Sequence, residues 1–414
     1  MRRVFVTGIG AVTPVGIGKR EFWNQIQGGC SGIRRVTRFD ASPFHSQVAG
    51  EVHGFRPEQW VPAKALKRMD RFSRFSVSAA KMAVEDSGLH IDREDSDRIG
   101  CFLGSALGGV SFGEIQYRNY HERGLRAVDS ALALTVFAGA GSCNIAIHLG
   151  INGPTSANAD SCASGPIAIG RALQSIRLGE ADVMLAGAAE TPLTPLAFGA
   201  FDLIRAMSTH YNETPEAACR PFDQNRDGFV MGEGAAMLVL ESEEHARKRG
   251  AVCLAEIAGY SLTNDGSHMT APRADGAQAA RAISLALRDA GCTPEEIDVV
   301  SAHGSSTPLN DPTETLALKT ALGDHAYQVP VIGTKSIHGH SLGASGAIEA
   351  AIFSLGLYHQ WLPGTLNLQH PSPDCDLNYA QNGPVCGPFK TALSNSFGFG
   401  GINACLVLKA VDRE

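Results

Sequence analysis

Short apolar runs rich in β-branched residues alternate along the chain with longer amphipathic stretches. The short runs have the length of buried strands. We expect strands at Val4–Gly8, Ile99–Leu103, Val183–Ala186, Ala235–Leu240, Val299–Ala302 and Cys405–Leu408. The longer stretches predict helices at Phe72–Ser87, Pro166–Leu178 and Gly276–Ala290. This alternation predicts a layered α/β fold with largely buried sheets.

Two short segments recur in the same order along the chain. Phe229–Leu240 (FVMGEGAAMLVL) resembles Phe397–Leu408 (FGFGGINACLVL), and Cys162–Ile167 (CASGPI) resembles Gly343–Ile348 (GASGAI). One match of this kind is weak, but two at similar separations favour an internal duplication. We therefore expect two related α/β halves, residues 1–250 and 251–414, with the candidate nucleophile in the first half only.

Composition excludes several classes of protein. The chain has 414 residues, 44% of them hydrophobic, and a formal charge of −7 that argues against a general nucleic-acid binder. It contains no run of eighteen apolar residues, and its first apolar run is only a strand's length, so we expect neither membrane insertion nor a signal peptide. The ten cysteines lack paired spacing, which predicts reduced thiols and a cytoplasmic location.

Cys162 is the first candidate for chemistry. It follows an extended stretch of small residues and precedes a helical pattern, which predicts a sharp strand-to-helix turn. The partial positive charge at a helix N-terminus favours thiolate and would lower the pKa of the thiol. Free backbone N–H groups there could stabilise an oxyanion. A buried structural cysteine is the alternative, but the Gly, Ser and Ala neighbours would let a substrate approach the backbone closely.

Histidines at two predicted strand ends are the second candidate. His303 follows one strand and opens a hydroxyl-rich loop, while Lys335, His338 and His340 lie between another strand and the second Gly/Ala-rich helix. A single histidine at a strand end is usually structural, but two such sites in one half favour a cleft. A zinc site is not expected, because no carboxylate or cysteine lies at ligand spacing.

Four motifs together resemble a known family. In order they are DSCASG, AHGSSTPLND, GTKSIHGHSLGASG and NSFGFGGINA, and they resemble the β-ketoacyl-[acyl-carrier-protein] synthases, closest to type II. The similarity extends over essentially the whole chain. It implies a thiolase-like fold, with two duplicated βαβαβαββ halves in a five-layer αβαβα arrangement, and a dimer whose active site lies in a narrow tunnel.

The resemblance implies a role for each motif. Cys162 would accept an acyl chain from acyl carrier protein, and malonyl carrier protein would then lose carbon dioxide and attack that thioester. His303 and His340 would donate hydrogen bonds to the malonyl thioester oxygen. The amides of Cys162 and Phe399 would form the oxyanion hole. Lys335 would order the electrostatics of the histidines by pairing with Glu314. This chemistry needs no redox or metal cofactor.

The resemblance also implies supporting positions. Glu349 and Asn395 would hold the centre from behind, and Phe399 would act as a mobile gate between glycines. Further positions are Thr270 and Thr307 for the pantetheine arm, and Phe201, Leu107 and Gly108 for the acyl pocket. For each apolar position, plain core packing is the alternative.

A basic segment suggests where an acidic carrier protein would dock. KALKRMDRFSR contains five cations in an otherwise acidic chain: Lys64, Lys67, Arg68, Arg71 and Arg74. Complementary charge at the tunnel mouth would steer the carrier. Arg205 resembles another such contact. A solvated helix face is the other interpretation.

Some residues depart from the common type II pattern and leave alternatives open. They are Ser161 before the nucleophile, His338, Ile402 and Cys405. His338 could add a polar group near the tunnel and alter the substrate range. A specialised polyketide or polyene ketosynthase, alone or in a heterodimer with a chain-length-factor subunit, would have the same motifs. A degradative thiolase would need a second catalytic cysteine, and a non-catalytic scaffold would lack the nucleophile.

Overall fold

One continuous sheet built from two mirrored sets of strands forms the centre of the protein. The structure is a computed structural model and describes residues 2–412. The strand order is β6-β5-β7-β8-β1 in the first set, continued by β9-β15-β14-β10-β11 in the second. Their bounds are β1 Val4–Thr13, β5 Ile99–Gly104, β6 Thr155–Asn158, β7 Val183–Glu190, β8 Gly234–Ser242, β9 Ala255–Asn264, β10 Val299–Ser301, β11 Val331–Ile332, β14 Thr391–Gly398 and β15 Ile402–Lys409.

The two sets of strands meet only along a short contact. β1 pairs with β9 through Phe5 opposite Glu256 and Val6 opposite Ala255. The mirrored order makes β8 the counterpart of β15, and these two strands carry one of the repeats seen in the sequence. This symmetry supports our proposal that the chain divides into related halves near residue 250.

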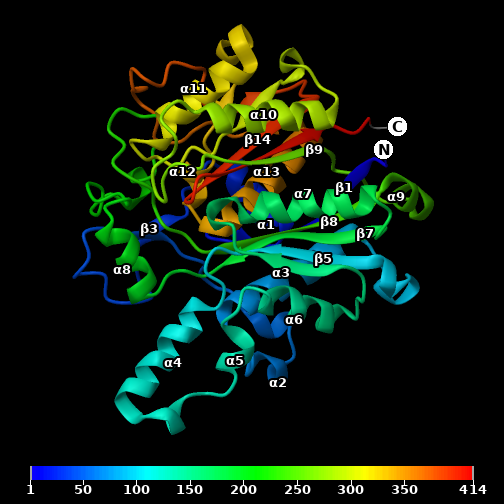
Figure 1. The fold of residues 1–414 in the computed structure, drawn as a ribbon, viewed down its shortest axis with the longest axis vertical. Coiled ribbons are helices and arrows are strands. Elements are labelled where there is room, and N and C mark those ends of the chain that lie inside the picture. Colours follow the sequence, from blue (N-terminus) through cyan, green and yellow to red (C-terminus); the bar gives the residue numbers. More distant parts are fainter. Residues whose placement is uncertain (1, 413–414) are drawn as a thin grey trace.

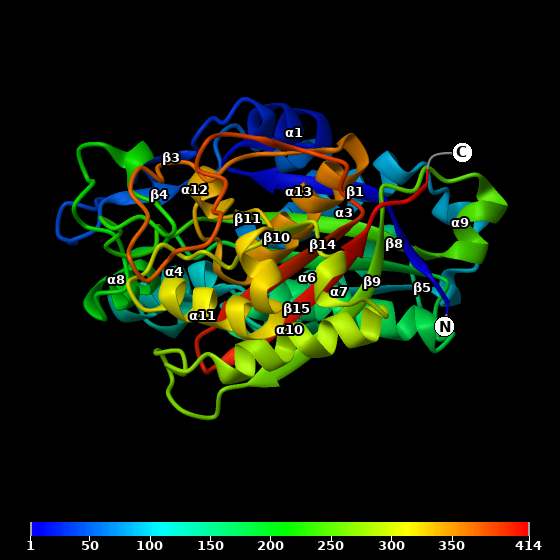
Figure 2. The ribbon, with the colours of Figure 1, turned by 90° about the horizontal axis from the view of Figure 1, so that it is seen from above.

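Helices cover the outer face of each set of strands and fill the space between the two sets (Figure 1). α7 and α13 lie in the middle, α3 and α6 cover the first set of strands, and α10 and α11 cover the second. Figure 2 looks onto this last layer, with α10 and α11 in front of β14 and β15. The bounds are α3 Arg71–Ser87, α6 Ala140–Leu149, α7 Ser164–Arg177, α10 Ala277–Ala290, α11 Asn310–Leu322 and α13 Ser345–His359. The five-layer α/β arrangement is confirmed.

Smaller elements decorate this framework. They are β2 Gly16–Ile17, β3 Ile33–Arg35, β4 Val48–Gly50, β12 Trp361–Leu362, β13 Val385–Cys386, α1 Lys19–Gln27, α2 Ala63–Leu66, α4 Val110–Arg123, α5 Leu132–Thr135, α8 Pro195–Leu203, α9 Glu243–Arg249 and α12 Lys335–His338. α4 and α5 project from the body of the protein (Figure 1). No helix within residues 2–412 is long and apolar enough to cross a membrane.

Local sequence signals explain where the longest helix begins and ends. The Asp70 side chain accepts a hydrogen bond from the Ser73 N–H, which caps the start of α3, and Gly88 ends it with a left-handed φ of 64°. The helix packs closely on β1, since a Cβ added to Gly10 would lie 1.9 Å from the Ala79 carbonyl oxygen. The predicted strands and helices all lie in observed elements, with ends that differ by a few residues.

A buried carboxylate ties β1, β8 and α9 together. Glu241 at the end of β8 is fully buried and accepts hydrogen bonds from Thr7, His245 and Arg249. Burial alone would raise the pKa of Glu241, but the bonds from Arg249 and His245 outweigh it and lower the pKa to about 2. The bond to Glu241, with a second one to Glu94, raises the pKa of His245.

The variant His245→Gln tests this cluster. Because its folded pKa is raised, charged His245 stabilises the fold fully below the unfolded pKa of about 6.5, and this contribution is lost as the pH rises through the folded value. We expect the free energy of unfolding, measured by urea denaturation, to fall by about 1–2 kcal/mol at pH 6 and by less at pH 9. His210→Gln is the control, because His210 is exposed beside Asp227. Equal losses at both pH values would contradict the prediction.

Candidate active site

Cys162 lies in the predicted sharp turn between a strand and a helix. β6 ends at Asn158, a single helical turn covers Ser161–Ala163, and α7 begins at Ser164. Ser161 has a φ of 53°, a left-handed conformation that is uncommon for residues other than glycine. Cys162 is only 8% exposed and lines a cavity. The turn therefore presents the thiol to this cavity from the N-terminal end of a helix.

The pKa of the Cys162 thiol is raised, whereas the helix N-terminus alone predicted a lower value. Burial raises the pKa of Cys162, and this effect outweighs a hydrogen bond from Ser161, the charge of Lys335 and the Phe399 N–H, which all act in the opposite direction. The sequence showed the helix N-terminus but not how completely the sulfur leaves water. Thiolate formation therefore depends on the donors around the sulfur.

The loop between β14 and β15 covers the thiol. The Phe399 N–H donates to Cys162 Sγ, and a Cβ added to Gly398 would lie 3.2 Å from the Cys162 nitrogen. Gly400–Gly401 take φ values of 84° and 75°, which only glycine adopts readily. The Phe399 ring stacks on Phe201 with 6.1 Å between ring centroids. The loop thus brings the Phe399 N–H and an aromatic ring to the sulfur.

His303 and His340 face each other in the same cavity. Their ring centroids are 5.3 Å apart, and both side chains are buried. His340 Nδ1 lies 2.7 Å from the Ser345 hydroxyl, while His303 Nδ1 has no protein partner. Burial, followed by the charge of Lys335, holds the pKa of each imidazole well below its usual value. Both rings are therefore neutral near pH 7, and each has one N–H to donate.

Lys335 forms its ion pair with a different carboxylate from the one expected. Its Nζ lies 2.6 Å from Glu349 Oε1 and also donates to the His303 carbonyl oxygen. The expected pair with Glu314 is wrong, because α13 carries Glu349 directly against the ammonium group. Burial raises the pKa of Glu349 to about 7, and Lys335 opposes that shift. Both side chains are fully buried.

Glu314 instead holds the backbone that carries His303. Its carboxylate accepts the N–H groups of His303 and Gly304, each over 2.8 Å, and the Asn395 side-chain amide over 3.2 Å. The Cys405 thiol in turn contacts Asn395 Oδ1 over 3.4 Å. Glu314 and Asn395 thus support the backbone of His303. Cys405, a buried residue of β15, contributes through its contact with Asn395.

The cavity at Cys162 brings together eight of the nineteen predicted site residues. Its volume is about 330 Å³, and its lining includes Cys162, Phe201, Arg205, Thr270, His303, Thr307, His340 and Phe399. Leu107 and Gly108 are not among the lining residues. Leu107 instead packs against the apolar cluster that contains Cys162, so it lies behind the observed wall.

Asp265 and Asn403 also line the cavity, although the sequence motifs did not predict a role for them. Asn403 donates to Asp265 Oδ1 over 2.8 Å, and the Asp265 N–H donates to the Gly401 carbonyl oxygen over 2.8 Å. The pair therefore anchors the glycine loop that carries Phe399. Asn403 stood inside the NSFGFGGINA motif and could have been found, whereas nothing near Asp265 in the sequence indicated its partner.

His338 does not add a polar group to the cavity. It is fully buried, lies outside the lining, and has Nε2 3.4 Å from the Thr334 hydroxyl. Burial lowers its pKa to about 3, so the ring is neutral. Within residues 2–412, no group of three or more His, Cys, Asp or Glu side chains is arranged to hold a metal ion.

The basic segment divides into an exposed part and a structural part. Lys64, Lys67 and Arg68 are exposed, but Arg71 binds the buried Glu233 over 2.7 and 2.8 Å and Arg74 donates to a backbone carbonyl. None of the five cations lines the cavity, and α2 is well separated from α8 in Figure 1. Within one chain, the exposed cations are therefore separate from the cavity mouth, where Arg205 lies.

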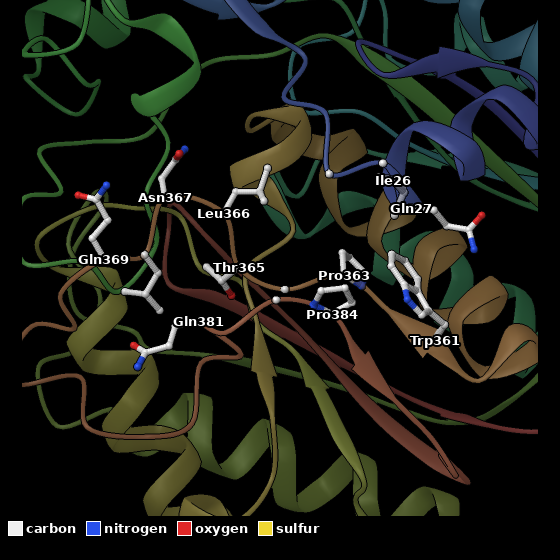
Figure 3. Close-up of a pocket in the computed structure, with 15 residues that line it drawn as sticks. Ile26, Gln27, Trp361, Pro363, Thr365, Leu366, Asn367, Gln369, Gln381 and Pro384 are labelled. Atoms are coloured by element: carbon white, nitrogen blue, oxygen red, sulfur yellow. The ribbon is translucent and has the colours of Figure 1, made fainter.

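A second cavity of about 430 Å³ lies elsewhere, beside α1 and β12 (Figure 3). Trp361, Pro363 and Pro384 form one part of its wall, and Gln369 and Gln381 another. Its fifteen lining residues, all in the described part of the chain, include no acid, base or thiol. This cavity lacks the groups for nucleophilic chemistry, so Cys162 marks the candidate active site.

Comparisons with known proteins agree with this site. The family model "Beta-ketoacyl synthase, N-terminal domain" matches residues 1–246, and the corresponding C-terminal model matches residues 254–369. A "3-oxoacyl-[acyl-carrier-protein] synthase 2" of Synechocystis sp. is 43% identical over 99% of this chain and 98% of its own. The protein of that name from Coxiella burnetii is 41% identical over 99% of both chains.

Solved structures give the same result. A ketosynthase bound to a hexaketide, in complex with its type II PKS acyl-carrier protein, has a TM-score of 0.93 and 38% identity over 99% of this chain and 100% of its own. The ishigamide ketosynthase/chain length factor has a TM-score of 0.93 and 37% identity over the same shares. With both family models and full-length relatives in agreement, this chain belongs to the β-ketoacyl synthase family.

Proposed function

We propose that this protein catalyses the decarboxylating condensation of an acyl chain with malonyl-acyl carrier protein, which gives 3-oxoacyl-acyl carrier protein in fatty-acid elongation. One observation carries the proposal: the Cys162 thiol and two neutral imidazoles, His303 and His340, line one buried cavity. The curated relatives named 3-oxoacyl-[acyl-carrier-protein] synthase 2 support it. The enzyme is accordingly an acyltransferase.

The first step is transfer of the acyl group to Cys162. The sulfur attacks the carbonyl carbon of the carrier-bound thioester, and the C–S bond to the pantetheine arm breaks, so that the carrier leaves as a thiol. The carbonyl oxygen carries the negative charge of the intermediate. The N–H groups of Cys162 and Phe399 border the sulfur and would stabilise this oxyanion. Thr270 and Thr307 line the cavity and can bind the pantetheine arm.

The second step forms the carbon–carbon bond. The malonyl group loses carbon dioxide, and the electron pair of the broken bond moves into an enolate. His303 and His340 donate their N–H groups to the enolate oxygen, which favours the state in which charge develops. The enolate carbon attacks the acyl thioester and Cys162 leaves as thiolate. No net oxidation occurs, so electrons balance without a redox cofactor.

A specialised polyketide ketosynthase is the second candidate. The ketosynthases bound to a hexaketide and from the ishigamide pair have TM-scores of 0.93 with this chain. They would use the same cysteine and histidines, so the site geometry fits both functions. The higher identity of the fatty-acid relatives favours elongation. In the polyketide case, the partner would be a chain-length-factor subunit.

Two other functions fit the site less well. A degradative thiolase would need a second cysteine near Cys162, but Cys405 is buried against Asn395 and does not line the cavity. A scaffold subunit would have no use for a thiol and two imidazoles in one cavity, or for a buried Lys335–Glu349 pair that binds the His303 carbonyl oxygen. The arrangement of these groups therefore supports catalysis.

We propose a homodimer, formed through the face that carries α4, α5 and β6. β6 is an edge strand, which can pair with a second chain, and the neighbouring helices expose apolar side chains. These are Ile115, Tyr117, Tyr120, Leu134, Val136, Phe137 and Ile147. In this dimer, the exposed cations Lys64, Lys67 and Arg68 would serve a carrier bound at the partner's cavity. Ten free cysteines support a reducing, cytoplasmic location.

Acylation of Cys162 is the direct test of the first step. Intact-protein mass spectrometry should detect one acyl group after mixing with acyl carrier proteins of C4 to C16, and Cys162→Ala should carry none. Cys143→Ala is the control, because Cys143 is an exposed thiol outside the cavity. Elongation of saturated chains after addition of malonyl carrier protein supports fatty-acid synthesis. Acylation by keto-bearing or polyunsaturated chains alone would favour the polyketide function.

The proposed role of the two histidines is tested by variants that should lose decarboxylation but keep acylation of Cys162. His303→Ala and His340→Ala should still be acylated, but release of carbon dioxide from malonyl carrier protein should fall by about 100-fold or more, because enolate stabilisation is lost. His338→Asn is the control, since His338 lies outside the cavity. Equal losses of acylation and decarboxylation would contradict these roles.

Charge reversal is the test for carrier docking. Arg205→Glu, and the triple change of Lys64, Lys67 and Arg68 to Glu, should each raise KM for acyl carrier protein roughly tenfold without changing acylation by a small acyl-pantetheine thioester. Lys248→Glu, which changes an exposed cation on α9 outside both groups, is a further comparison. An unchanged KM in the Arg205 and triple variants would contradict docking by these residues.

A further inference from the structure

Glu190, the last residue of β7, is a buried carboxylate that the proposed mechanism does not use. It is fully buried, and no basic side chain of the described chain forms an ion pair with it. Four donors bind it instead: the Ser105 hydroxyl at 3.1 Å and the N–H groups of Ala106 at 2.5 Å, Leu107 at 3.1 Å and Gly343 at 3.2 Å. We call these four bonds the Glu190 clamp.

The clamp joins two segments that border the nucleophile. Ser105–Leu107 belong to the loop between β5 and α4, and Gly343 belongs to the turn between His340 and α13. Leu342 lines the cavity with Cys162, and Leu107 packs behind it in the same apolar cluster. The two segments touch, since a Cβ added to Gly343 would lie 2.6 Å from the Ala106 nitrogen. An acyl chain that leaves the cavity between Leu342 and Leu107 would therefore have to part them. The clamp holds their backbones together.

The internal duplication gives this clamp a particular place in the fold. Gly343 in the GASGAI repeat corresponds to Cys162 in CASGPI, and the preceding residues, Leu342 and Ser161, both have left-handed φ values, 41° and 53°. In the first half, the corresponding N–H belongs to Cys162, which carries the reacting sulfur. In the second half, the Gly343 N–H is occupied by the Glu190 carboxylate. The anion-binding turn of the second half is thus filled from within the protein.

The free-energy cost of burying the Glu190 carboxylate without a cationic partner indicates a functional role. Burial raises the pKa of Glu190 to about 7, against the effect of its four donors. A protonated Glu190 would face only donors, so the clamp is complete when the group is an anion. Burying an unpaired charge is unfavourable, and such groups concentrate at functional sites. Gly343 leaves no room for other contacts, because an added Cβ would lie 2.9 Å from Glu190 Oε2.

We propose that Glu190 is a positioning residue that fixes the Leu107 loop against the Leu342 turn and thereby limits the length of acyl chain that Cys162 accepts. This inference rests on the proposed function, because it concerns the acyl chain on Cys162. With the clamp intact, the wall behind the sulfur resists separation. With the clamp weakened, longer chains enter at lower cost, while short chains are unaffected.

The experiment compares acylation of Cys162 by C6 and C16 acyl carrier proteins in the wild type and in Glu190→Gln. Gln has the same shape but no charge, and its amide N–H₂ replaces one acceptor. We expect the ratio of kcat/KM for C16 over C6 to rise roughly tenfold, with kcat/KM for C6 within twofold of the wild type. Ser105→Ala, which removes one donor and keeps the carboxylate, should shift the ratio in the same direction by less.

Glu51→Gln is the matched control. Glu51 is also buried and bound by N–H and hydroxyl donors, from Thr37 and Arg38, but it does not line the cavity. It should leave the chain-length ratio unchanged. An unchanged ratio in folded Glu190→Gln and Ser105→Ala, checked by thermal melting, would overturn the clamp. Failure of the wild type to accept any acyl group would instead overturn the proposed function.

Discussion

The close contact between α7 and α13 is the constraint on which the active site depends. A Cβ added to Gly165 would lie 2.8 Å from the Ala347 nitrogen, and one added to Gly346 would lie 2.4 Å from the Pro166 side chain. Small residues in both first turns therefore allow the two helix N-termini to meet in the middle layer. The turn before α7 carries Cys162 and the turn before α13 follows His340. Their position beside one cavity follows from this packing.

Around that contact, the fold buries charge that an ordinary core would exclude. Lys335, Glu349, Glu314 and Glu190 are all fully buried. Each has partners on other elements, so the desolvation cost is offset by hydrogen bonds and by one ion pair. Three apolar clusters, one around the central helices and one under each outer layer of helices, supply the stability that this requires. The polar centre is thus held rigidly, and catalytic groups with altered pKa values become possible.

The duplication explains why the site contains two similar turns, of which only one carries a thiol. Each half contributes a strained turn followed by a Gly/Ala-rich helix, and the two turns lie near each other. Only the first carries a thiol. The second binds an internal carboxylate in place of a substrate, while its neighbouring segments supply His303, Lys335 and His340. The first turn therefore presents a thiol to the cavity, and the second is a structural support.

The sequence alone determined which elements form and which chemical groups the chain brings. Periodicity is a local property, so the predicted strands and helices lie in observed elements, and the motifs selected the thiol and the two imidazoles that line one cavity. Only the tertiary structure decided the partner of Lys335, the burial of His338, the diversion of Arg71 to Glu233 and the raised pKa of Cys162. Each of these depends on contacts between residues far apart in the chain and on the exclusion of water. Both are set by packing, which no local pattern of residues specifies.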